Sequence, residues 1–326
     1  MKRAVIFLIT VYVSVPIIIY LFPWILGHVV YSHLLKVPFF VDLSRPDKIL
    51  NHTTNLYLPT EEGVSVGVWH TLPVSQWEHS AGKGSEWYQE ALADGRPVIV
   101  YLHGNTGTRA IHHRVELVKI LSAAGYHVLS FDYRGFGDSS GEPSEAGLTT
   151  DALYLYRWAK QHSGGSHVYL WGHSLGTGVA TNAALRSQQE GGSVVDALIL
   201  EAPYTSIRKA TECHVLAKMF SLLPGVKNLL TETLEKNKLV LASDENLKRL
   251  ESPLLVLHAE DDNILPYHMG QELYQIALGA QKGRPDAEAR VQMVSYRAAL
   301  GYGHDNIYLD PDLVQLLGDF LKGLET

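Results

Sequence analysis

The stretch VYLWGHSLGTGV, from Val168 to Val179, decides the fold. Its apolar beginning predicts a buried strand, residues 172–176 predict a tight turn, and the small residues that follow predict the start of a helix. A serine on such a strained turn needs glycine neighbours, because the strand and helix backbones pass close on either side. The Ser174 hydroxyl is therefore expected to stand exposed at the end of the strand, as in a nucleophile elbow.

From residue 97 onward, the chain alternates between short apolar runs and longer helical segments. The apolar runs lack a polar residue at every second position, so both faces of these strands are expected to be buried. This pattern predicts an α/β fold with a mostly parallel central sheet flanked by helices. Besides the strand before the elbow, strands are predicted at 55–59, 64–70, 98–102, 127–132, 197–200, 253–258 and 291–295, and helices at 109–124, behind Ser144, from the elbow to about 188, around 273–278 and at 313–324.

Residues 204–250 interrupt this alternation. The segment is longer than a connecting loop and mostly helical in composition, so we expect a helical cap insertion above the sheet. Its apolar stretch, residues 215–223, either packs onto the core domain or faces an acyl chain or the bilayer.

The bulk properties exclude several classes of protein. The 326 residues carry a net charge of −7 and are 46% hydrophobic, which argues against a nucleic-acid-binding protein with its basic stripe. The one cysteine, Cys213, cannot form an intrachain disulfide and is expected to pack as a small apolar residue. Neither a metal-ligand spacing nor a phosphate-binding loop is visible, so no metal and no cofactor are expected.

The N-terminus predicts a membrane anchor. Lys2 and Arg3 precede an uncharged run over 4–35, of which residues 4–26 alone reach across a hydrocarbon core of about 30 Å. A cleaved signal peptide has a shorter apolar region and a small-residue cleavage site, and a buried globular helix has a polar face. We therefore expect a cytosolic tip and transmembrane helix over 1–35, kinked at Pro16 and Pro23.

A linker over 36–50 and a catalytic domain over 51–326 are expected to follow the anchor. The positive charges at the N-terminus place that end in the cytosol and the domain across the membrane. Asn51 begins the chain's single N-x-[ST] sequon and is a glycosylation candidate on the lumenal side.

The catalytic acid is expected directly after the strand at 253–258. Three carboxylates compete there, Glu260, Asp261 and Asp262. Asp262 lies four residues before Pro266, a spacing that is common where this loop turns into its helix, and we select it over Asp261.

The base is expected after the last strand, where His304 lies in a glycine-flanked loop. His258 and His268 lie closer to the acid, but neither is on this last loop. The order serine, aspartate, histidine is the one this type of elbow requires. In this interpretation, His304 takes a proton from Ser174 and later gives one to the leaving alcohol, while Asp262 orients the ring.

An oxyanion is expected to be held by two backbone N–H groups. One belongs to Leu175 at the start of the elbow helix, and the other to Asn105 in the loop after the strand at 98–102. His103 in that loop is expected to be a structural hydrogen-bonding residue. The polar loop at 132–139 is expected to hold the active-site loops by ion pairs.

Five segments together resemble the membrane-anchored α/β-hydrolase-domain lipases that cleave lysophosphatidylserine and monoacylglycerols. They are LHGNTGTR, FDYRGFGDS, GHSLGTGVATN, DALILEAPYTSI and PLLVLHAEDDNILP. The resemblance, over 97 to about 309, implies an α/β-hydrolase fold with Ser174 as nucleophile, Asp262 as acid and His304 as base. It also implies an endoplasmic reticulum membrane protein with a lumenal domain and membrane lipids as substrates. Asn263 departs from the pattern, because proline is frequent at that position.

There are three alternatives to a lipase. Related hydrolases that share the H-G-N and G-H-S elements remove palmitoyl groups from proteins as thioesterases. An acyltransferase is compatible because alcohols compete with water for the same acyl-enzyme. The third hypothesis is a binding module without catalytic activity. It conflicts with the presence of all three catalytic residue types.

If the domain is lumenal, treating the expressed protein with an N-glycosidase will increase its gel mobility, because Asn51 will carry a glycan. The Asn51→Gln variant is the control and will run at the deglycosylated position with or without enzyme. Unchanged mobility of the intact protein will contradict a lumenal domain.

Overall fold

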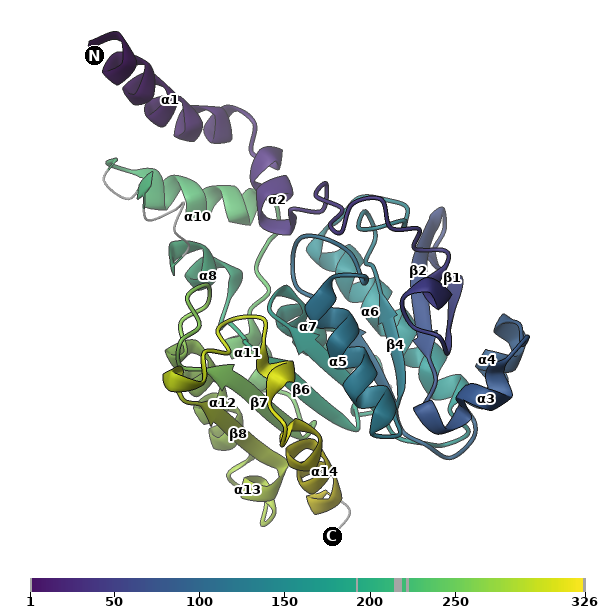
Figure 1. Cartoon of the computed structure of the whole chain (residues 1–326). Helices are drawn as coiled ribbons and strands as arrows, with labels where there is room; N and C mark the ends of the chain where they lie inside the picture. Colours follow the sequence, from purple (N-terminus) through teal and green to yellow (C-terminus); the bar gives the residue numbers. More distant parts are fainter. Residues whose placement is uncertain (1, 192, 214–218, 221–222, 325–326) are drawn as a thin grey trace.

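The fold is built on one eight-stranded sheet (Figure 1). The computed structural model describes residues 2–191, 193–213, 219–220 and 223–324. The strand order is β1-β2-β4-β3-β5-β6-β7-β8, and β2 runs antiparallel to both of its neighbours while β4, β3, β5, β6, β7 and β8 pair in parallel. The strands are β1 Thr53–Glu61, β2 Val64–Thr71, β3 Val98–Leu102, β4 His127–Phe131, β5 Val168–His173, β6 Ala197–Glu201, β7 Leu254–Ala259 and β8 Val291–Tyr296. The predicted mostly parallel α/β sheet is confirmed.

Helices cover both faces of the sheet, and each face has its own apolar core. In β3, Val98 and Val100 pack on one side, while Ile99 and Tyr101 pack on the other. The first side is covered by α6 (Glu145–His162), α7 (Leu175–Gln189) and α12 (His268–Gln281), and the second by α5 (His112–Ala123) and α14 (Leu313–Gly323). Burial on both faces explains why the strand sequences are continuously apolar. The short helices outside these layers are α3 Trp77–Ser80, α4 Ser85–Ala91 and α13 Ala287–Arg290.

The turn between β5 and α7 is as strained as its sequence predicts. Ser174 has φ 51° and ψ −118°, a conformation that residues with a side chain rarely adopt. A Cβ atom on Gly172 would lie 2.4 Å from the carbonyl oxygen of Gly176, and one on Gly176 would lie 1.9 Å from the carbonyl oxygen of Leu102. Both positions therefore require glycine, because the opposing atoms belong to the backbone and cannot move aside.

The N-terminal segment is bent at Pro23, as the sequence predicts, whereas the helix continues through Pro16. Helix α1 (Lys2–Leu21) and helix α2 (Trp24–Tyr31) are separated by a short break that contains Pro23. Proline has no N–H to donate, and its ring clashes with the carbonyl four residues earlier, so the helix ends there. Within the described residues, no single helix meets the length and hydropathy of a membrane span, but the pair Ile9–Leu21 and Trp24–Tyr31, bent by 109°, meets both together.

Parts of the expected anchor over 1–35 and linker over 36–50 pack into the domain. Leu26 and Tyr31 of α2 are buried in the core beneath α6 and α7. In the expected linker, Leu43 and Leu50 are buried in the opposite core, and the Leu43 carbonyl accepts a hydrogen bond of 2.8 Å from the indole of Trp69. These four side chains therefore attach the segment to the two apolar cores of the domain, while other apolar side chains of the segment, such as Leu34 and Phe39, are exposed.

The predicted insertion is present between β6 and β7, and we call residues 204–250 the cap. It contains α8 (Ile207–Cys213), α10 (Val226–Lys236) and α11 (Ser243–Leu247), and α10 lies alongside the N-terminal helices (Figure 1). The Tyr12 ring of α1 stacks on Phe220 of the cap at 4.9 Å, and the Asn237 side chain donates a 2.9 Å hydrogen bond to the Pro23 carbonyl. In the apolar stretch 215–223, residues 215–218 and 221–222 lie outside the described residues.

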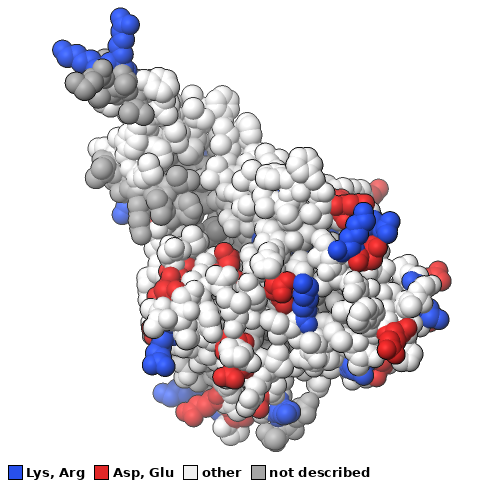
Figure 2. All heavy atoms as spheres, in the orientation of Figure 1, with Lys and Arg blue, Asp and Glu red and all other residues white. Residues whose placement is uncertain are grey.

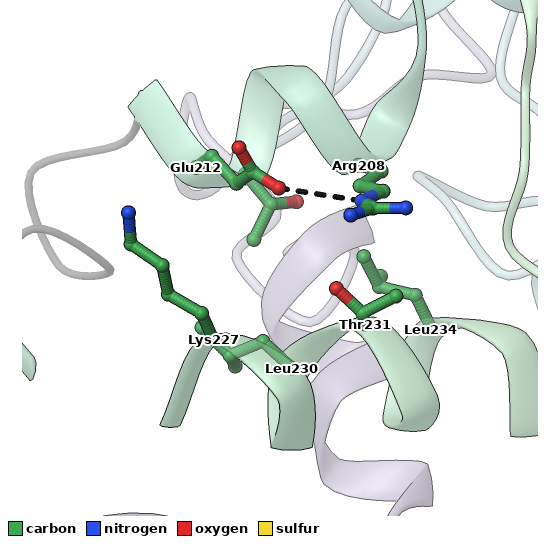
Figure 3. A pocket seen from close by; sticks show the side chains of 7 residues that line it. Arg208, Glu212, Lys227, Leu230, Thr231 and Leu234 are labelled. Atoms are coloured by element: carbon green, nitrogen blue, oxygen red, sulfur yellow. Dashed lines mark hydrogen bonds and ion pairs between the residues drawn. The ribbon is translucent and has the colours of Figure 1, made fainter. Parts of the chain in front are cut away.

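Charged side chains are distributed unevenly over the surface. Figure 2 shows them spread over the body of the domain, whereas the part that carries the N-terminal helices is mostly uncharged on this face. Several side chains of α1 and the break after it are exposed and apolar, among them Phe7, Ile9, Ile17, Leu21 and Phe22. The cap also carries a small separate hollow between α8 and α10, where Arg208 pairs with Glu212 at 3.3 Å (Figure 3).

Gly176→Ala will lower the free energy of unfolding by about 3 kcal/mol or more, because its methyl group meets the Leu102 carbonyl at the end of β3. Gly279→Ala is the matched control. It lies in the last turn of α12 with nothing within 4 Å of an added Cβ, and it will raise stability by about 0.4–1 kcal/mol. Thermal unfolding in detergent measures both, and equal melting temperatures for the two variants will contradict the close packing of the elbow.

Candidate active site

The structure brings Ser174, Asp262 and His304 together at the carboxyl ends of three parallel strands. Ser174 follows β5, Asp262 follows β7 and His304 follows β8. The Nδ1 atom of His304 lies 2.7 Å from an Asp262 carboxylate oxygen, and its Nε2 atom lies 2.9 Å from the Ser174 Oγ. Because the carboxylate accepts the Nδ1 proton, Nε2 carries the lone pair and the serine hydroxyl donates to it. This arrangement lets the imidazole remove the serine proton.

Asp262 is held as a carboxylate by the groups that donate to it. The backbone N–H groups of Ile264 and Leu265 donate at 2.9 and 2.8 Å, and the Nε2 of His258 donates at 3.2 Å. Burial by itself raises the pKa of Asp262, but the hydrogen bonds from His258 and His304 outweigh it and hold the pKa well below its usual range. The negative charge is therefore present whenever His304 works.

His304 receives the matching shift. Burial lowers the pKa of its imidazole, but the hydrogen bond and the negative charge of Asp262 raise it, and the net pKa lies above its ordinary value of 6.5. A raised pKa makes the ring a stronger base toward the serine hydroxyl and stabilises the cation that forms after proton transfer.

Two residues that compete with the selected ones in the sequence have supporting positions. Both carboxylate oxygens of Asp261 accept the N–H of Gly303 at 3.1 Å, so Asp261 fixes the loop immediately before His304. His258 is fully buried and donates to Asp262 and to the Leu265 carbonyl. Neither contacts Ser174 among the hydrogen bonds of the described chain.

The loop after β3 lies against the nucleophile. A Cβ atom on Gly104 would lie 3.1 Å from the Ser174 Cβ, closer than most such contacts, so a side chain there would crowd the nucleophile. Asn105 and Leu175, whose backbone N–H groups are the candidate oxyanion donors, both line the cavity next to Ser174. His103 is buried and its Nδ1 donates to the Gly104 carbonyl at 2.6 Å, the structural position that the sequence predicts.

Arg114 fixes this loop, and the sequence analysis missed it. Its fully buried guanidinium donates to the carbonyl oxygens of Gly104, Asn105, Thr106 and Thr108 at 2.9–3.3 Å. Four carbonyls pointing at one cation leave the loop little conformational freedom. The available signal was the helical spacing that places Arg114 on the same side of α5 as the apolar residues Val118 and Leu121.

An ion-pair network supports the loop from behind. Asp132 accepts the backbone N–H of Arg109 at 2.7 Å and pairs with its guanidinium, which also contacts Asp138 at 2.7 Å. The predicted ion pairs of the 132–139 loop are thus confirmed. Each buried charge has an opposite partner, which is the condition for its burial.

The N-terminal segment pairs directly with the same loop. The N–H groups of Thr106, Gly107 and Thr108 donate to the carbonyls of residues 31, 35 and 37 at 3.1, 2.9 and 2.9 Å, and the Asn105 side chain donates to the Val30 carbonyl at 3.3 Å. The sequence predicts an anchor and a linker for these residues and no role at the site. In the structure, they form one edge of it.

A cavity of about 620 Å³ opens onto Ser174 and His304. Its walls are mostly apolar and come from three parts of the chain: the N-terminal helices, the cap and the loops of the sheet. The lining includes Val15, Ile19, Leu26, Val29 and Val30 from the N-terminal helices and Ile207, Phe220, Leu229 and Leu230 from the cap. The cavity can therefore hold an apolar chain whose polar end lies at the triad.

The fold and this arrangement of serine, histidine and aspartate define a serine hydrolase of the α/β-hydrolase fold. The alpha/beta hydrolase fold family matches residues 97–224. Among solved structures, an esterase of Pyrococcus furiosus, Pf2001, is similar with a TM-score of 0.64 and 17% identity over 90% of this chain and 98% of that chain. An alpha-beta hydrolase from Vibrio vulnificus also has a TM-score of 0.64, with 18% identity over 90% of this chain and 92% of that chain.

The chain belongs to the ABHD12 family. It is 46% identical to lysophosphatidylserine lipase ABHD12 of Danio rerio over 99% of this chain and 84% of that protein. It is 47% identical to the protein of the same name from Xenopus tropicalis, over 100% of this chain and 83% of that protein. It is 48% identical to the human protein ABHD12B, over 90% of this chain and 79% of that protein.

Replacing the two neighbouring aspartates will separate their roles. Asp262→Asn will lower kcat by about 10⁴-fold, because the ring of His304 loses the acceptor that fixes its tautomer. Asp261→Asn keeps an oxygen that can accept the Gly303 N–H and will lower kcat by less than about tenfold. Kinetics on a soluble ester measure both variants, and the reverse order will show that Asp261 is the catalytic acid.

Proposed function

We propose that the protein hydrolyses carboxylic esters of single-chain lipids, such as lysophosphatidylserine and monoacylglycerols, through an acyl-enzyme on Ser174. The observation that carries this proposal is the apolar cavity of about 620 Å³ that ends at the triad. Its volume lies within the range of about 300–1,000 Å³ that is common for small-molecule sites. The names of the Danio rerio and Xenopus tropicalis relatives, lysophosphatidylserine lipase, agree with such a substrate.

The proposed reaction has two halves, acylation of Ser174 and hydrolysis of the acyl-enzyme, and the same groups act in both. Ser174 attacks the ester carbonyl while His304 accepts its proton, and Asp262 stabilises the imidazolium. The N–H groups of Asn105 and Leu175 hold the oxyanion. His304 then gives its proton to the departing glycerol oxygen, and the fatty acyl group stays on Ser174. In the second half, water attacks the acyl carbonyl while His304 takes its proton. His304 then returns that proton to the Ser174 Oγ, the bond between Oγ and the acyl carbon breaks, and the fatty acid leaves.

The N-terminal helices are proposed to enter a bilayer and to anchor the protein. The bent pair α1–α2 has the length and composition of a broken span, and its exposed side chains are apolar. Lys2 and Arg3 at its tip favour a cytosolic N-terminus and a lumenal domain in the endoplasmic reticulum. Because helices α1 and α2 line the cavity, a lipid is expected to enter it directly from the membrane.

Ser174→Ala will lower hydrolysis of lysophosphatidylserine by the full-length protein by at least about 10³-fold. The same variant will not be labelled by a fluorophosphonate probe. Wild-type protein will release fatty acid from lysophosphatidylserine and monoacylglycerol faster than it cleaves an acyl-cysteine peptide, because the cavity accepts a free lipid.

The outcomes of this experiment separate the alternatives. Preferred cleavage of the acyl-cysteine peptide will establish a protein thioesterase. Absence of probe labelling in the intact protein will establish a silent module. In cells, acute loss of the protein will raise lysophosphatidylserine, and unchanged lysophospholipids will contradict the proposal.

A further inference from the structure

Three side chains of metal-ligand type meet in the wall of the cavity, outside the triad. His113 comes from the first turn of α5, His173 precedes the nucleophile, and Asp305 follows the base. An Asp305 carboxylate oxygen lies 3.7 Å from the Nε2 of His173 and 3.8 Å from the Nε2 of His113. The three ligand atoms all lie within 4.8 Å of one another.

The nitrogen of His113 that faces this group has no partner. Its Nε2 atom is buried without a hydrogen bond in the described chain. A buried imidazole nitrogen without a partner is costly, so its placement calls for a ligand. His173 is 2% exposed, and its Nε2 donates to the His304 carbonyl, while its Nδ1 atom has no partner in the described chain.

Asp305 gives a cation access to this group. Its side chain is half exposed, so a cation can reach its carboxylate from the cavity. The carboxylate adds a negative charge beside the buried His173 and the mostly buried His113.

We propose that His113, His173 and Asp305 form a binding site for a divalent transition metal of the Zn²⁺ class, and that the bound ion inhibits the enzyme. Bonds of about 2.0–2.1 Å in a tetrahedral site separate neighbouring ligand atoms by about 3.4 Å. The observed 3.7 and 3.8 Å to the Asp305 carboxylate need to close by a few tenths of an ångström. The two imidazole nitrogens lie within 4.8 Å of each other and need to close by up to about 1.4 Å. Two imidazoles favour Zn²⁺, Cu²⁺ or Ni²⁺ over Mg²⁺ and Ca²⁺, which prefer oxygen ligands.

Inhibition follows from the present role of His173. Its Nε2–H donates a 3.0 Å hydrogen bond to the backbone carbonyl of His304 and so holds the loop that carries the base. A metal ion on Nε2 replaces that proton, which moves to Nδ1, the nitrogen that now has no partner. The loop then loses its hydrogen bond, and the added positive charge disfavours the imidazolium that His304 forms during the reaction.

The first test measures inhibition of the full-length enzyme in detergent with buffered free Zn²⁺, comparing each variant with its own metal-free rate. Zn²⁺ will inhibit the wild type reversibly, and EDTA will restore activity. His113→Asn and Asp305→Asn will each raise the half-inhibiting Zn²⁺ concentration by at least about tenfold. His112→Asn is the matched control, because His112 lies next to His113 on α5 but is exposed, and it will behave like the wild type.

The second test does not need turnover, so it separates this proposal from the proposed lipase activity. Co²⁺ added to the Ser174→Ala protein will give the visible absorption of a tetrahedral site, and the spectrum will be lost in the same protein with His113→Asn. Inhibition of equal potency in the wild type and both ligand variants will overturn the proposal. So will the absence of a Co²⁺ spectrum in protein that is folded by its thermal unfolding.

Discussion

The close contact between Gly176 and the carbonyl of Leu102 is the constraint on which the rest of the site depends. It brings the start of α7 against the end of β3, and the loop that follows β3 is the one that faces Ser174. One backbone contact thus sets the position of the nucleophile and of the candidate oxyanion donors together. Because both partners are backbone atoms of the parallel sheet and its helix, side-chain motion cannot loosen it.

The site keeps its charges in a water-poor environment by pairing most of them and by raising the pKa of one buried carboxyl. Asp132 lies against Arg109, and Asp262 accepts several N–H groups. Glu201 at the end of β6 receives one side-chain hydrogen bond, from Trp171, and burial raises its pKa from 4.5 to about 7. The folded protein therefore retains a proton that the unfolded chain releases, so this group's contribution to stability falls as the pH rises from about 4.5 to about 7.

The sheet, the elbow and the three triad positions were predictable because each has a local signal. For the triad, the signal is a polar residue directly after an apolar run, because the carboxyl ends of parallel strands meet at one edge of the sheet. Two sets of hydrogen bonds were not predictable: those from Arg114 to four carbonyls, and those between residues 30–37 and the loop at 105–108. The second set joins segments that are far apart in the sequence. Arg114 bonds carbonyls only six to ten residues before it, but backbone carbonyls leave no trace in the sequence. The sequence predicted a kink at Pro23 but not the packing of α2 into the core. An apolar helix has a similar sequence whether it contacts lipid or the protein interior.

The hydrogen bonds between residues 30–37 and the loop at 105–108 make the first part of the chain inseparable from the chemistry. A chain that began at β1 would still contain Ser174, Asp262 and His304, but the loop beside the nucleophile would lack the carbonyl acceptors of residues 30–37. An active variant without the apolar N-terminal helices would therefore need other groups to accept those hydrogen bonds.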